Sequence, residues 1–150
     1  MRPLYLFRHI SCEGPGYLAE VLERHAIPWK LVSIDAGDPV PADVEHCSGL
    51  VFMGGPMSVN DPLPWIEQEL ALIRAAADRH LPVLGHCLGG QLISMALGGE
   101  VTRNRVREIG SIDLAVTNHC SSEHDMAERG LGKVALVHDD AIEIAPVKDR

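Results

Sequence analysis

The chain has 150 residues, of which 46% are apolar and 23% charged, and its formal net charge is −8. This composition is typical of a soluble globular protein, and the length suits one domain, residues 1–150, rather than two. The acidic charge argues against nucleic-acid binding, because phosphate backbones repel an acidic surface. No apolar run reaches the length of a signal-peptide core or a membrane span, so we expect a cytoplasmic protein without membrane association.

The cysteines give no sign of a disulfide framework or a zinc ribbon, because they are spread along the chain at Cys12, Cys47, Cys87 and Cys120. We expect free thiols in a reducing compartment. His119 and His124 flank Cys120 closely enough to share a metal ion, but their segment is polar and lacks a second ligand pair, which favours a surface loop. We predict no metal site and no cofactor.

Strand-like and helix-like segments alternate along the chain. Residues 4–7, 29–34 and 47–53 have the apolar composition of buried strands. A helix predicted to begin after Pro15-Gly16 connects the first two strands. Alternation of this kind predicts an α/β fold with a doubly wound, mostly parallel sheet and helices on both faces.

The clearest helical pattern follows Asp61, which we expect to be the N-cap. One face of this predicted helix is apolar and carries Ile66, Leu70, Ile73 and Ala77. The other residues predict an ordinary solvated face, with Glu67, Glu69, Arg74 and Asp78.

The segment from Pro82 to Gln91 has the pattern of a buried strand that turns sharply into a helix at Cys87. Gly85, Cys87 and Gly89 form the thiol version of a nucleophile elbow, in which small neighbours permit the turn. The positive end of the helix dipole favours the thiolate there. The alternative is a buried structural cysteine, which the glycine frame disfavours.

The helix after the elbow, residues 88–97, is predicted to close at Gly98-Gly99. Residues 112–116 alternate as a half-exposed edge strand, residues 118–132 form a polar loop, and residues 134–137 are a last predicted strand. Binding sites in such folds gather beyond the carboxyl ends of the strands, where Gly54-Gly55 and Cys87 both lie.

These two segments suit the chemistry of a cysteine that attacks an amide or ester. Such a reaction needs an oxyanion hole and a base. We expect the backbone N–H groups of Leu88 and Gly55 to be the oxyanion donors, since glycine lets its peptide turn toward a bound carbonyl oxygen.

Gly54-Gly55-Pro56-Met57-Ser58 and residues 85–91 resemble, in order and spacing, the two motifs of the class I glutamine amidotransferase family, and residues 104–110 are similar to a segment of its stand-alone members. The resemblance implies that Cys87 attacks the side-chain amide of glutamine, that ammonia leaves, and that water hydrolyses the γ-glutamyl thioester. It also implies that Gln91 helps to hold the substrate, together with Gly54, Gly55 and Leu88.

The resemblance fails at the far end, because the His-Pro-Glu element that supplies the family's base occurs nowhere in the 150 residues. The chain therefore resembles a truncated or rearranged member. His138 is the candidate base and Asp140 its candidate orienting residue, because H-x-D spacing places both side chains on one side of an extended segment. The alternative is that His138 is an ordinary surface histidine. His119 and His124 are further candidates for the base, whereas the side chain of His86 is expected to point away from the site.

Three functions stay open at this point. The first is an active amidotransferase or glutaminase that uses glutamine or a γ-glutamyl compound. The second is a weak relic or a binding or regulatory module of the same fold, and the third is a redox-sensor or peptidase-like protein with a reactive thiol. A missing C-terminal layer would expose apolar surface, so we expect a homo-oligomer or a synthetase-type partner.

Overall fold

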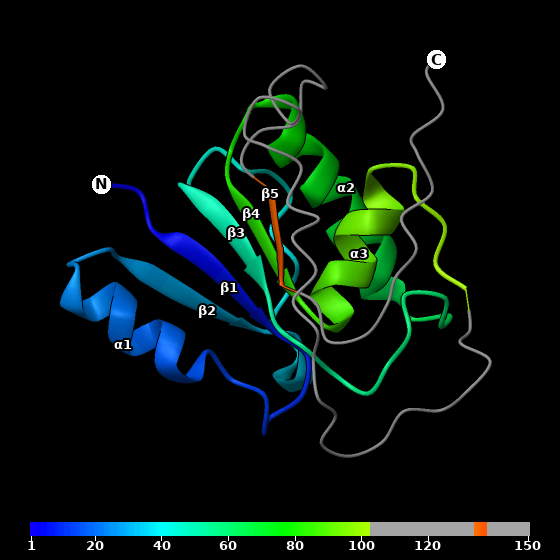
Figure 1. Cartoon of the computed structure of the whole chain (residues 1–150), viewed down its shortest axis with the longest axis horizontal. Helices are drawn as coiled ribbons and strands as arrows, with labels where there is room; N and C mark the ends of the chain where they lie inside the picture. Colours follow the sequence, from blue (N-terminus) through cyan, green and yellow to red (C-terminus); the bar gives the residue numbers. More distant parts are fainter. Residues whose placement is uncertain (103–133, 138–150) are drawn as a thin grey trace, which may run out of the picture.

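In the part of the chain that the structure describes, the strands form a five-stranded parallel sheet with the order β2-β1-β3-β4-β5 (Figure 1). The computed structural model describes residues 1–102 and 134–137, the latter as backbone only. The strands are β1 (Leu4–Arg8), β2 (Trp29–Ser33), β3 (Gly49–Phe52), β4 (Val83–His86) and β5 (Val134–Val137). The helices are α1 (Gly16–Arg24), the 3-10 turn η1 (Ile34–Ala36), α2 (Pro64–Asp78) and α3 (Leu88–Ala96).

Helices cover both faces of the sheet, which confirms the doubly wound prediction (Figure 1). Successive side chains of a strand point to opposite faces. On one face, Leu6 and Val51 pack with Leu22 of α1. On the other face, Phe7 and Phe52 stack with their ring centroids 4.6 Å apart, under α2 and α3.

The strand order changes direction at β1, which pairs with β2 on one side and β3 on the other. Ligands of open parallel sheets bind outside the carboxyl ends of the strands at such a switch point. His9 follows β1 there, and Met53 followed by Gly54 continues β3. Cys87 follows the next strand, β4, at the same edge of the sheet.

Two predictions about α2 are wrong. The helix begins at Pro64 after Leu63, and Asp61 caps a turn instead, its Oδ2 accepting from Ser58 N at 2.9 Å. Proline suits the first helical turn because the missing N–H has no partner there anyway. The second error concerns Glu69, which is fully buried and does not lie on the predicted solvated face.

The other elements agree with the sequence prediction to within a few residues, including β5 at residues 134–137. Gly98 follows α3 with a positive φ of 88°, as a C-terminal glycine should. No helix in the described part of the chain is long and apolar enough to cross a membrane. The predicted strand at residues 112–116, the loop at 118–132, and His138 and Asp140 lie outside the described residues.

Candidate active site

Cys87 is the single residue between β4 and α3, and its backbone is strained. Its φ of 52° and ψ of −109° lie outside the regions that a residue with a side chain normally adopts. Such conformations cost roughly 1–3 kcal/mol and persist only where the surrounding structure enforces them. The sharp turn predicted at Cys87 is therefore present, and its thiol is free and half-buried.

The glycines on either side of Cys87 permit close contact between backbone segments. A Cβ on Gly85 would lie 2.5 Å from the carbonyl group of Gly89. A Cβ on Gly89 would overlap the carbonyl oxygen of Phe52 in β3. Any side chain at Gly85 or Gly89 would separate β4, α3 and β3, so the glycine frame seats the helix directly on the sheet.

The helix α3 begins at the carbonyl of Cys87, which accepts from Gly90 N at 2.8 Å and from Gln91 N at 3.2 Å. The first N–H groups of a helix have no partner within it. The Leu88 N–H is one of these, directly after the sulfur-bearing residue. It is available to a negative charge that develops beside Cys87.

Gly55 lies against this helix start. A Cβ on Gly55 would meet Leu88 Cδ2 at 3.3 Å, Met57 Cε at 3.2 Å and the Cβ of His9 at 3.4 Å. The fold thus brings Gly55 and Leu88 together, although 33 positions separate them in the sequence. Their backbones are the two that the sequence nominated as oxyanion donors.

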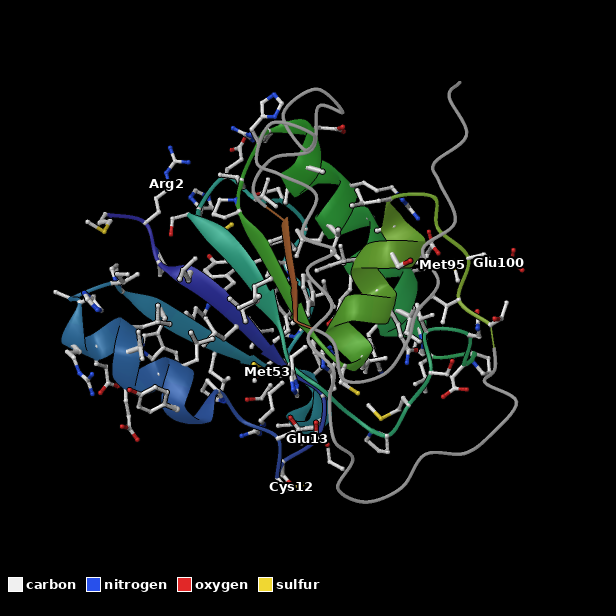
Figure 2. All side chains as sticks on the ribbon, in the orientation of Figure 1. Arg2, Cys12, Glu13, Met53, Met95 and Glu100 are labelled. Carbon is white, nitrogen blue, oxygen red and sulfur yellow. The ribbon has the colours of Figure 1, made fainter. Side chains whose placement is uncertain are left out.

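Gly54 is buried and borders two polar side chains, Glu13, for which the sequence predicted no role, and His86, which was expected to point away. A Cβ on Gly54 would overlap Glu13 Oε2 and would lie 3.4 Å from His86 Nδ1. Glu13 and Met53 lie at the same end of the sheet (Figure 2). Only glycine leaves room for the Glu13 carboxylate beside this turn, so Glu13 and His86 flank the loop.

Gln91 connects the elbow helix to the glycine loop. Its Oε1 accepts from Val59 N at 3.2 Å. The side chain predicted to hold substrate therefore holds the segment after Gly54-Gly55 in place, one helical turn beyond Cys87. This contact fixes the distance between the two candidate motifs.

A buried pair, His9 and Glu69, lies behind the loop and was not predicted. His9 Nε2 is 3.0 Å from Glu69 Oε2, and both side chains have no exposed surface. Burial raises the pKa of Glu69, and the hydrogen bond from His9 opposes that shift. A signal was present in the sequence, since 3.6 residues per turn places Glu69 between Ala76 and Ile73 on the helix surface.

Residues 17–147 match the family described as "Glutamine amidotransferase class-I". The chain belongs to this family. A glutamine-hydrolysing GMP synthase of Alkaliphilus metalliredigens is 35% identical over 121 residues, covering 80% of this chain and 21% of that protein. A putative glutamine amidotransferase-like protein, YfeJ of Salmonella typhimurium, is 34% identical over 116 residues, covering 73% and 48%.

Solved structures agree with this assignment. A glutamine amidotransferase from Methylobacillus flagellatus is 48% identical with a TM-score of 0.71, covering 73% of this chain and 44% of that one. A glutamine amidotransferase from Thermotoga maritima, at 24% identity and a TM-score of 0.63, shares the fold. The chain thus spans less than half the length of these relatives.

Membership of the amidotransferase family narrows the three functions that the sequence left open. It favours the glutamine amidotransferase prediction over an unrelated redox-sensor or peptidase-like protein. His138 and Asp140 of this amidotransferase domain are outside the described residues, as are His119, Cys120 and His124. However, β5 ends at Val137, which is paired in register with His86, the residue before Cys87.

Proposed function

We propose that this amidotransferase domain hydrolyses the side-chain amide of glutamine, or of a related γ-glutamyl compound, through Cys87. The thiolate attacks the amide carbon, and the amide oxygen becomes an oxyanion that accepts from the N–H groups of Gly55 and Leu88. A C–N bond breaks, the leaving nitrogen takes a proton, and ammonia departs from a γ-glutamyl thioester. Water then cleaves the C–S bond, which yields glutamate and restores the thiol.

The observation that carries this proposal is the closeness of Gly55 to the Leu88 side chain, next to a strained Cys87. A non-glycine residue with this backbone conformation is costly, and such strain clusters at functional sites. In this proposal the N–H groups of Gly55 and Leu88 both point toward the charge that develops on oxygen. Gly54, beside Gly55, and Gln91, through Val59, support the same loop, in keeping with their proposed part in holding substrate.

The base is proposed to be His138, oriented by Asp140. The support is the register of β5, whose last residue, Val137, is paired with His86 next to the thiol. A general base must reach the proton it moves within hydrogen-bond distance, or through one water. His138→Gln is expected to remove most of the ammonia release but to leave alkylation of Cys87 by a glutamine analogue.

Because a glutamine-hydrolysing GMP synthase is among the relatives, we also propose that the chain associates with a synthetase-type partner, which receives the ammonia, or with a second copy of itself. The cytoplasm is the proposed location, since its reducing conditions suit the free thiols Cys12, Cys47 and Cys87. The second candidate is a binding or regulatory module of the same fold. Binding of glutamine without turnover would support that candidate.

Ammonia release from glutamine tests the proposal, with Cys87→Ala as the key variant. Cys12→Ala is the matched control, because Cys12 is an exposed free thiol that takes no part in the proposed hydrolysis. We expect wild-type protein and Cys12→Ala to release ammonia at the same rate and Cys87→Ala to fall to background. Equal rates for all three proteins would overturn the proposal.

A further inference from the structure

We propose that His9 and Glu69 are positioning residues that lock the Met53 peptide and thereby aim the Gly55 N–H at the oxyanion. The inference rests on the proposed role of Gly55 in the oxyanion hole. It assigns a task to the buried pair, which no step of the amide hydrolysis uses.

The hydrogen bonds of His9 fix its tautomer. Its Nδ1 lies 3.2 Å from the carbonyl oxygen of Met53. A carbonyl oxygen only accepts, so Nδ1 carries a proton and donates. One further proton lies between Nε2 and the Glu69 carboxyl group, whichever of the two it is bonded to. The ring therefore spans from α2 to the end of β3 with both nitrogens engaged.

Both backbone polar groups of Met53 are hydrogen-bonded. Its N–H donates to the carbonyl of Phe7 at 3.0 Å, and its carbonyl accepts from His9. The chain then enters Gly54-Gly55, where glycine imposes almost no conformational preference of its own. The direction of the Gly55 N–H must consequently be set by its surroundings. His9 constrains this direction in two ways, because its Cβ also lies beside Gly55, 3.4 Å from where a Cβ on Gly55 would stand.

The helix α2 holds His9 through two residues one turn apart. Glu69 engages Nε2, and the Trp65 ring lies against the imidazole with centroids 5.0 Å apart. A buried charged pair is often no more stable than apolar side chains of the same volume. Stability alone therefore gives little reason for this pair, whereas a directional hydrogen bond to Met53 is something that apolar residues cannot supply.

Two double variants separate the hydrogen bond from the packing. His9→Asn/Glu69→Leu keeps an N–H donor near the position of Nδ1, and His9→Phe/Glu69→Leu keeps a ring but no donor. In both, an apolar residue replaces the carboxylate, so no buried charge is left unpaired. Cooperative urea unfolding of each variant checks that it folds.

The measurement is the rate of Cys87 alkylation by a chloroketone analogue of glutamine, divided by the rate with iodoacetamide. The ketone oxygen of the analogue uses the oxyanion hole, whereas iodoacetamide reports the reactivity of the thiol. Loss of one oxyanion donor costs on the order of 100-fold or more. We expect the ratio to fall at least about tenfold in His9→Phe/Glu69→Leu and to be largely kept in His9→Asn/Glu69→Leu, with the iodoacetamide rate unchanged in both.

Equal ratios in the two double variants, or a parallel fall of both alkylation rates, would overturn the inference and leave the proposed function intact. A wild-type protein that shows no preference for the chloroketone would overturn the proposed function and the inference with it. If His9→Phe/Glu69→Leu does not fold, Glu69→Ala is compared with Glu69→Gln, whose amide still donates to Nε2. The ratio must then fall in Glu69→Ala alone, and equal values would contradict the inference.

Discussion

The elbow at Cys87 and the pair of His9 and Glu69 serve the same end of the sheet but are specified in different ways. The elbow is local, since Gly85, Cys87 and Gly89 set its shape within five residues. The pair joins residues 60 positions apart in the sequence, and the sequence around either residue does not indicate that the two are in contact. A nucleophile can thus be encoded by a short motif, while the support behind its oxyanion loop depends on the whole fold.

The largest expected effect is at the elbow. Gly89→Ala would drive a Cβ into the Phe52 carbonyl group, whose carbon would be 2.8 Å away. We expect a loss of about 3 kcal/mol in the free energy of unfolding, measured in urea. The new Cβ would clash with main-chain atoms of β3, and these cannot move aside as a flexible side chain could. Gly90→Ala is the matched control, as nothing lies within 4 Å of its Cβ position. It should gain up to about 1 kcal/mol from helix propensity, and equal losses would contradict the account.

The buried pair should appear in the pH dependence of stability. Burial raises the pKa of Glu69 above its ordinary 4.5, so between the two values the folded protein holds a proton that the unfolded chain has lost. The contribution of Glu69 to the free energy of unfolding therefore falls as pH rises through this window. Its slope corresponds to a difference of at most one bound proton between the folded and unfolded states. The free energy of unfolding of the wild type should therefore decrease relative to that of Glu69→Gln as pH increases. Parallel curves would show that Glu69 titrates normally.

Backbone strain at Cys87 predicts a stability gain on loss of the side chain. Glycine tolerates a φ of 52° with little cost, whereas alanine keeps the Cβ. Cys87→Gly should be more stable than Cys87→Ala by about 1 kcal/mol in thermal or urea unfolding. Both variants should be inactive, so the comparison isolates the strain. If Cys87→Ala is as stable as Cys87→Gly, or more stable, the turn is unstrained.

The smallest effect is expected at Gln91, which joins the elbow helix to the glycine loop. Gln91→Met removes the acceptor for Val59 N and should cost about 1 kcal/mol in the free energy of unfolding. Gln91→Glu keeps an acceptor oxygen and is the control, with a smaller loss. If the two variants lose the same amount, the contact does not stabilise the loop.

The sequence predicted those features that depend on neighbours along the chain. Apolar runs and helical periodicity located the strands and helices, and glycines marked the turns at Gly54 and Cys87. The assignment of Glu69 to solvent failed, because a carboxylate in a helix is ordinarily exposed and only His9, brought over by the sheet, makes its burial tolerable. Glu13 was missed for the same reason, since its contact with Gly54 exists only once β1 and β3 are paired.

The central claim is that Cys87, and no other thiol, reacts with glutamine. Mass spectrometry after brief reaction with the chloroketone analogue tests this directly. The account predicts one label per chain, located on Cys87, and slower labelling when glutamine is added in excess. Labelling of the exposed Cys12 at the same rate, with no protection by glutamine, would contradict it.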